Sequence, residues 1–246
     1  MLPTRTKYQH HYKHEIAPEM NQISSSSGVG LVNYSLSEIQ AQCRKAARGA
    51  GLAWGLAEEA GMACRWLASF DLPGPRVLAE LLRLNDGKPY ETLRPASLDG
   101  NWEALGGRLC PLIAGATLSD IAAERVAGHH VELAAVAFPM LLLPFLGLAA
   151  KQHGVAQELR CNCTRVTCLP DGISISGDVT LLQTAHARHV VCVGAERAEP
   201  DHKPSAQSRA IDASAWATLE FFAHRTYVPA TDASRAGAGS TLSDDQ

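Results

Sequence analysis

The feature that most constrains the fold is a set of apolar and small side chains that recurs at helical spacing between residues 35 and 70. In the first part the stripe consists of Leu36, Ile39, Cys43, Ala46 and Ala50. In the second part it consists of Leu56, Ala60, Ala63, Leu67 and Phe70. This spacing is typical of amphipathic helices, and small residues let two helix backbones approach closely. The pattern therefore predicts a tightly packed antiparallel pair of helices.

Local signals place the ends of these helices. Ser35 and Glu38 have the spacing of a capping box, in which each side chain satisfies the backbone N–H of the other residue. We therefore expect the first helix to begin at Ser35. Gly49 and Gly51 end it, and a third helix is predicted over residues 76–84 after the second one.

The composition changes after the third helix. Residues 88–108 are rich in Pro, Gly and Asp, which predicts a loop. A helix is expected between Pro144 and Gly154, and Asp212 is positioned to cap a last helix. That helix carries three apolar residues on one face: Trp216, Leu219 and Phe222. Strands are predicted over residues 131–138, 159–166, 173–176 and 189–193.

This order of elements predicts the fold class and the domain organisation. An N-terminal helical hairpin with a third helix, a β-rich middle and a closing C-terminal helix are typical of an α+β fold. We expect residues 33–228 to form a single α+β domain. Residues 1–32 lack apolar periodicity and end in a Ser- and Gly-rich run, which predicts a poorly ordered leader. Residues 229–246 are expected to form a flexible C-terminal tail.

Composition excludes several classes of function. A net charge of −3 with scattered basic residues gives no basic face for nucleic acid. The most apolar stretch, residues 133–150, contains Pro139, Pro144 and Gly147, so buried core is favoured over a membrane span. Seven cysteines in a chain of 246 residues favour free thiols in a reducing compartment. We therefore expect a soluble cytoplasmic protein without nucleic-acid or membrane partners.

Two motifs suggest a cofactor or a metal site, but neither has the surrounding sequence that such a site requires. The glycines of residues 49–55 resemble a dinucleotide-binding pattern, but that motif follows a strand, whereas a helix precedes this one. A helix–helix turn is the better interpretation. Cys161, Cys163 and Cys168 lack the paired spacing of structural zinc sites, and His186 and His189 would have to complete such a site by long-range folding. We expect no metal and no cofactor.

A first polar cluster lies on the predicted helical hairpin. Arg44 and Arg48 are one helical turn apart, so both guanidinium groups can face the same way and bind a carboxylate or a phosphate. Glu58 and Glu59 lie on the second helix. The alternative is that these arginines and glutamates form ion pairs between the two helices.

A second polar cluster follows the closing helix. Residues 224–235 are dense in hydrogen-bonding side chains, among them Arg225, Tyr227, Thr231 and Arg235. This composition is typical of a segment that closes over a ligand, and equally of a fraying terminus. Both interpretations stay open at this point.

Four stretches of the chain resemble a bacterial family of unknown function, DUF3726. They are residues 34–39, 44–51, 54–61 and 225–235. The resemblance covers roughly residues 33–240. It implies a bacterial cytoplasmic protein and no particular reaction.

Two hypotheses of function follow. The first is an enzyme or enzyme subunit acting on a small anionic, carboxylate-bearing metabolite, with Glu58 or Glu59 as general acid or base and assistance from Tyr227. The substrate would be bound by Arg44, Arg48, Arg225, Thr231 and Arg235. The second is a non-catalytic structural or interaction protein in which the Arg and Glu clusters are ion pairs. A homo-oligomer is compatible with either.

Overall fold

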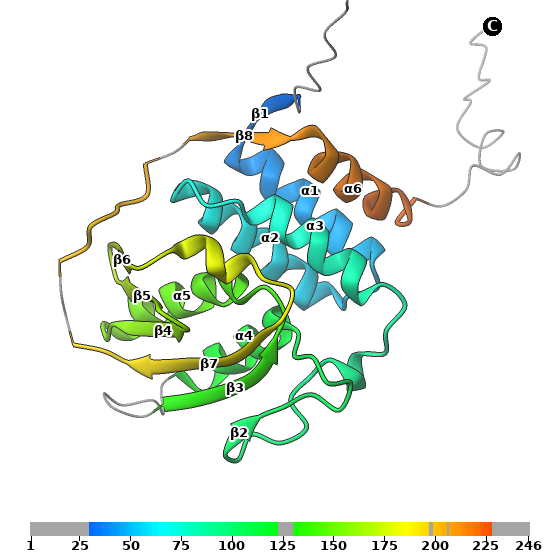
Figure 1. Cartoon of the computed structure of the whole chain (residues 1–246). Coiled ribbons are helices and arrows are strands. Elements are labelled where there is room, and N and C mark those ends of the chain that lie inside the picture. The colour runs from blue at the N-terminus through cyan, green and yellow to red at the C-terminus, as the bar shows by residue number, and fades with distance from the viewer. Residues whose placement is uncertain (1–29, 123–129, 197–198, 206, 228–246) are drawn as a thin grey trace, which may run out of the picture.

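The computed structural model describes residues 30–122, 130–196, 199–205 and 207–227 (Figure 1). The expected tail at residues 229–246, and the expected leader up to residue 29, lie outside these described residues. The described part forms a helical layer and a six-stranded sheet with its own helices, joined by one hydrophobic core. The predicted α+β class is confirmed.

Four helices form the helical layer. They are α1 (Leu36–Gly49), α2 (Trp54–Ser69), α3 (Gly74–Asn85) and α6 (Ala213–His224). The capping box is present: the Glu38 N–H donates to Ser35 Oγ at 3.2 Å, and the Ser35 N–H donates to Glu38 Oε2 at 2.8 Å. Asp212 caps α6 by accepting from the N–H of Ser214 at 2.7 Å. The predicted starts of both helices are confirmed.

Small residues set how closely α1 packs on its neighbours. A Cβ atom added at Gly61 of α2 would lie 2.7 Å from the Gln40 carbonyl oxygen of α1. A Cβ atom added at Gly49, at the end of α1, would overlap the carbonyl oxygen of Phe222 in α6. The predicted close antiparallel pair is confirmed, and α6 joins it through a second contact of the same kind (Figure 1).

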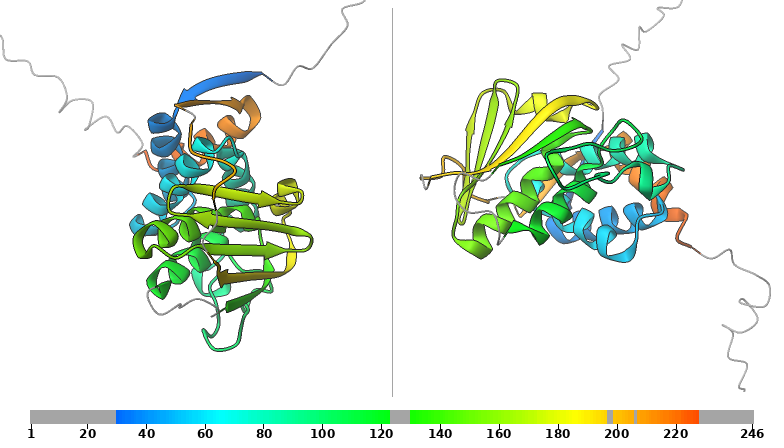
Figure 2. Two further views of the ribbon diagram at one scale, coloured as in Figure 1. Left: turned by 90° about the vertical axis from the view of Figure 1, so that its left-hand side faces the viewer. Right: turned by 90° about the horizontal axis from the view of Figure 1, so that it is seen from below.

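The sheet has the strand order β2-β3-β7-β4-β5-β6. The strands are β2 (Asn101–Trp102), β3 (His130–Val136), β4 (Gln157–Cys161), β5 (Thr164–Leu169), β6 (Gly172–Ser176) and β7 (Ala187–Gly194). All neighbours are antiparallel except β2 and β3. Helices α4 (Pro111–Asp120) and α5 (Leu143–His153) lie against one face of this sheet (Figure 2).

The outer edge of the sheet at β6 is covered by residues 200–204. Ile173 and His202 exchange two backbone hydrogen bonds of 2.9 Å, each N–H donating to the other carbonyl oxygen. A Cβ atom at Gly172 would lie 2.4 Å from the His202 carbonyl oxygen, so only glycine fits beneath this segment. At the opposite edge β2 is a strand of 2 residues.

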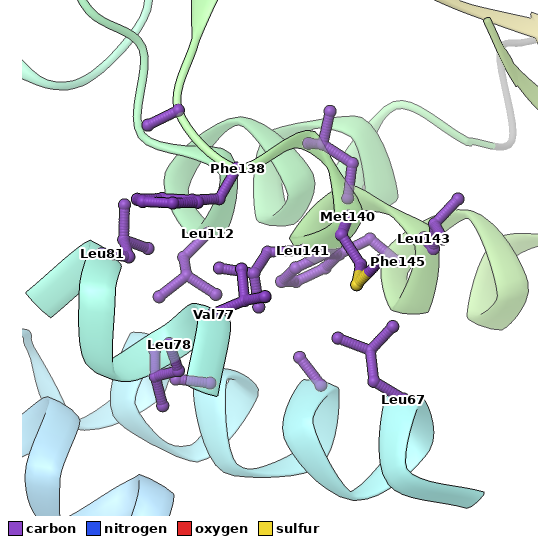
Figure 3. Packing of buried hydrophobic residues seen from close by; sticks show 14 of the residues in the cluster. Leu67, Val77, Leu78, Leu81, Leu112, Phe138, Met140, Leu141, Leu143 and Phe145 are labelled. Atoms are coloured by element: carbon purple, nitrogen blue, oxygen red, sulfur yellow. The ribbon is translucent and has the colours of Figure 1, made fainter. Parts of the chain in front are cut away.

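The core joins the two layers around a tight bend after β3. Phe138 has a left-handed backbone, and the 3-10 helix η3 (Pro139–Leu142) leads from it into α5. Side chains of this bend point at α2 and α3 and are surrounded by apolar residues of α2, α3, α4 and α5 (Figure 3). The labelled members are Leu67, Val77, Leu78, Leu81, Leu112, Phe138, Met140, Leu141, Leu143 and Phe145.

Two expectations about elements were wrong, and one helix was missed. Residues 159–166 are not one strand, because the chain reverses at Asn162, whose φ of 53° is left-handed, and forms the β4–β5 hairpin. Helix α4 was not predicted, since its apolar residues surround the helix instead of forming one stripe. Residues 31 and 32, expected in the leader, belong to β1 (Leu31–Ser35), which pairs with β8 (Ser208–Asp212).

The β1–β8 pair predicts where truncation begins to destabilise the protein. A chain that starts at residue 33 loses the pairs Leu31–Asp212 and Val32–Ile211, and with them part of the anchor of α6. We expect it to melt at a lower temperature than a chain starting at residue 30, which keeps both pairs. Equal melting temperatures of the two truncated chains by circular dichroism would show that the pair does not stabilise the fold.

Gly49 supplies a second prediction. Gly49→Ala forces α1 and α6 apart, and overpacking of this kind costs about 1–3 kcal/mol of unfolding free energy. Gly55 is a matched control, because it lies in α2 with open space around its Cβ position. Gly55→Ala is therefore expected to stabilise by about 0.5–1 kcal/mol. Urea titration measures both, and two effects of the same sign would contradict the assigned packing.

Candidate functional site

A cleft of about 400 Å³ opens between the α1–α2 turn, the end of α3 and the start of α4. Its size lies in the lower part of the range of about 300–1,000 Å³ that ligand pockets occupy. The lining residues are Arg48, Ala50, Gly51, Leu52, Ala53, Leu56, Leu81, Leu82, Asn85, Lys88, Tyr90, Leu93, Cys110, Leu112 and Ile113. The set contains two cationic side chains and no carboxylate.

The polar side chains at the mouth of the cleft are more exposed than the leucines at its floor. Lys88 and Tyr90 are exposed at the rim, and Arg48 is half-buried there. Leu81, with 1% of its surface exposed, and Leu112, with none, lie on the floor. The floor is continuous with the core, in which these two leucines are neighbours (Figure 3). A ligand in the cleft would therefore meet charge at the mouth and hydrocarbon below it.

Arg48 is held in place by the turn that it closes. Its Nη1 atom donates to the Leu52 carbonyl oxygen at 2.8 Å, and its guanidinium group lies 5.0 Å from the centre of the Trp54 ring. Gly51, with a φ of 96°, allows the chain to make this turn. No carboxylate of the described residues pairs with Arg48. The guanidinium group is thus fixed in position and keeps donors for an anion.

Asn85 lies between the rim and the floor, at the last position of α3. Its Oδ1 atom is buried and has no hydrogen-bond partner among the described residues. Buried polar atoms without a partner are uncommon in folded proteins. This carboxamide is therefore available for a polar group of a ligand.

Cys110 precedes α4 at the bottom of the cleft. Burial raises the pKa of its thiol, and this outweighs the opposing effect of the backbone N–H groups of Ile113 and Leu112. The thiol is therefore neutral at physiological pH and is a weak nucleophile. In this state it behaves as a small apolar side chain.

The two arginines predicted to face the same way have different partners. Arg44 forms an ion pair with Glu58 in which Nη1 and Oε1 are 2.9 Å apart. This pair links α1 to α2, as the ion-pair alternative expected, and neither residue lines the cleft. Arg48 alone of the two reaches the cleft.

Glu59, the neighbour of Glu58, lies in a different environment. Burial raises the pKa of its carboxyl group, and the nearby Asp120 raises it further. It lines a small cavity of about 120 Å³ beside Met62 and Trp66, away from the cleft. The predicted roles of Glu58 and Glu59 in proton transfer stay predictions.

Arg225 lies where α6 ends and contacts the end of α3. Its Nη1 and Nη2 atoms donate to the two carboxylate oxygens of Asp86 at 2.6 and 2.8 Å, and its guanidinium group lies 4.6 Å from the centre of the Phe222 ring. Tyr227 is 59% exposed and contacts His224. Thr231 and Arg235 lie outside the described residues, so closure of this segment over a ligand stays a prediction.

The cysteines of the sheet are separated by the hairpin. Cys161 ends β4, Cys163 is exposed in the turn, and Cys168 lies in β5. The strand predicted over residues 159–166 would have held both Cys161 and Cys163, but the turn falls between them. Within the described ranges, no three His, Cys, Asp or Glu side chains are arranged to hold a metal ion. Nor does any helix in those ranges have the length and apolarity needed to cross a membrane.

A known protein family matches the part of the chain that forms most of this cleft. Residues 34–110 match the model of the family described as Protein of unknown function (DUF3726). The matched region includes α1, α2 and α3, and it contains every residue that lines the cleft except Leu112 and Ile113. The wider resemblance expected over roughly residues 33–240 is confirmed for this region alone, and a bacterial origin stays a prediction.

No curated protein matches the chain in sequence. Among solved structures the chain is similar to malate dehydrogenase from Entamoeba histolytica, with 11% identity and a TM-score of 0.41. The similarity covers 78% of this chain and 69% of that one. At this TM-score it carries no inference about activity.

The adjacent glutamates Glu58 and Glu59 predict opposite effects of the same substitution. The raised pKa of Glu59 means that the unfolded chain ionises first as the pH rises, so the folded state loses stability on passing from acidic to neutral pH. Glu59→Gln should therefore raise the melting temperature at neutral pH, and this gain should vanish near pH 4, close to the ordinary glutamate pKa of about 4.3.

Glu58→Gln is the matched control for that measurement. It removes the exposed ion pair with Arg44, which is worth about 0.2–1 kcal/mol, and should lower the melting temperature at neutral pH. Thermal denaturation of both variants across this pH range measures the difference. Stabilisation by both, or by neither, would contradict the environments assigned to the two carboxyl groups.

Proposed function

We propose that the protein binds a small organic anion, such as a carboxylate-bearing metabolite, in the cleft between the α1–α2 turn, α3 and α4. The observation that carries this proposal is the composition of the lining: Arg48 and Lys88 at the mouth, no carboxylate among the described lining residues, and an apolar floor. Unneutralised cations near one another favour an anionic ligand, which relieves their repulsion.

The two halves of the cleft make different contributions to binding. The guanidinium fork of Arg48 suits a carboxylate, with Lys88 as a second charge. The apolar floor favours a ligand that buries hydrocarbon, at about 25 cal/mol for each Å² removed from water. A purely polar anion such as inorganic phosphate would use the first contribution and lose the second.

The described lining residues support the binding of a ligand, and they do not include a group suited to catalysing its reaction. Glu58 is held by Arg44 and Glu59 faces another cavity, so neither stands beside a ligand in this cleft. The Cys110 thiol is neutral and buried. An enzymatic step would need a catalytic group from outside the lining set, which the proposal does not include.

A separate observation favours a second candidate function. Of the four arginines predicted to bind substrate, Arg44 and Arg225 are neutralised by Glu58 and Asp86. This is the arrangement expected of a non-catalytic interaction protein. Such a protein would keep its stability and its partner in the absence of any small anion.

The test measures binding of organic anions by thermal shift and by calorimetry. Octanoate and 3-phenylpropanoate should raise the melting temperature, because a ligand at about a hundred times its Kd stabilises by about 2.7 kcal/mol. Acetate, which has almost no hydrocarbon to bury, should shift it much less. If none of the three shifts the melting temperature, the interaction-protein alternative is favoured.

Variants at the mouth locate the site. Lys88→Met and Arg48→Met should each weaken octanoate binding about tenfold, the size of one lost charged contact of about 1.4 kcal/mol. Arg48→Lys keeps the charge and separates its effect from the loss of the hydrogen bond to Leu52. Lys45→Met is the matched control, because Lys45 is exposed on α1 and does not line the cleft. Equal loss in Lys45→Met would contradict the assigned site.

A further inference from the structure

We infer that the ligand is an aliphatic monocarboxylate that enters tail first, and that Cys110 and Ile113, at the start of α4, set the longest tail that the cleft accepts. The inference rests on the proposed function and adds to it the class of ligand, its orientation and the residues that determine its length. It follows from the order of side chains between the mouth and the floor.

The burial of the lining residues defines that order. Lys88 and Tyr90 are exposed, and Arg48 and Asn85 are half-buried below them. Cys110 is 4% exposed and Ile113 is 5% exposed. Among the described lining residues, those that are nearly buried are apolar except for the neutral Cys110 thiol, so the hydrocarbon end of a ligand is placed against them.

The start of α4 is the alternative position for the carboxylate of the ligand, because helix N-termini attract negative charge. Here the usual donors are engaged or missing. Pro111 has no N–H, the Cys110 N–H donates to the Leu93 carbonyl oxygen at 2.9 Å, and the Ala114 N–H donates to the Cys110 carbonyl oxygen at 3.0 Å. The N–H groups of Leu112 and Ile113 act on the Cys110 thiol.

No cationic side chain among the described lining residues lies at that depth. A carboxylate at the floor would lose its water without gaining a charged partner, and such burial is strongly unfavourable. The carboxylate is therefore placed at Arg48 and Lys88, and the tail points to α4.

The size of the floor side chains then limits the length of the tail. Each additional methylene strengthens binding about fourfold while it is still buried. Once the tail reaches the thiol of Cys110 and the side chain of Ile113, a further methylene must displace close-packed atoms or bend back. Affinity is therefore expected to rise along a series of straight-chain acids, reach an optimum and fall.

The experiment measures Kd by calorimetry for butanoate, hexanoate, octanoate, decanoate and dodecanoate on the full chain, each below its micellar concentration. Cys110→Ala deepens the cleft and should move the optimum to a longer acid, and Cys110→Leu should move it to a shorter one. Ile113→Val removes one methylene from the same floor and should also favour a longer acid. Cys161→Ala is the matched control, because Cys161 is a buried cysteine of β4 outside the cleft.

The outcomes separate this inference from the proposed function. If no acid binds the parent protein, both fail. If acids bind but affinity rises without an optimum, the tail lies outside the floor and tail-first entry is wrong. If an optimum exists and neither Cys110→Ala nor Ile113→Val moves it, these two residues do not set the length. Circular dichroism identifies variants that fail to fold, and the Ile113→Val series decides the question if Cys110→Leu is one of them.

Discussion

The close approach of α1 to two other helices is the constraint on which the arrangement of this protein depends. Gly61 allows α2 to lie against the backbone of α1 near Gln40, and Gly49 allows α6 to cross the end of α1 at Phe222. Because both contacts are made by backbone atoms, α1 has little freedom to shift. The turn that follows it, in which Arg48 donates to the Leu52 carbonyl oxygen, is therefore held in place. That turn forms one wall of the cleft.

The charged residues near this constraint divide into those that hold the fold and one, Arg48, that faces the cleft. Arg44 and Arg225 each have a carboxylate partner on another helix, so they link α1 to α2 and α6 to α3. Arg48 has a backbone carbonyl and an aromatic ring as partners instead. A carbonyl positions a guanidinium group without cancelling its charge. This difference makes Arg48, and not its neighbours, the centre of the proposed function.

The sequence allowed prediction of those features that depend on residues close together in the chain. The capping box of Ser35 and Glu38, the cap at Asp212 and the glycine after α5 are all local, and each was found where it was expected. The pairing of β1 with β8 was missed because its partners are far apart in sequence. The cleft was missed for the same reason, since Cys110 and Arg48 line it together although α2 and α3 lie between them in the sequence. Arg48 was predicted as a ligand-binding residue from its position on the helix, whereas Lys88 and Asn85 gave no signal, because a single polar residue in a loop or at a helix end is common.

The segment that covers β6 has a consequence for the behaviour of the protein in concentrated solution. An uncovered edge strand offers a row of free N–H and C=O groups on which strands of other molecules can assemble, and this is a common start of fibril formation. Here the exchange between Ile173 and His202 uses two of those groups, and Pro200, which contacts Gly172, has no N–H of its own to offer. At the far edge, β2 is too short to act as a template. The six-stranded sheet is thereby protected at both ends against growth by strand addition.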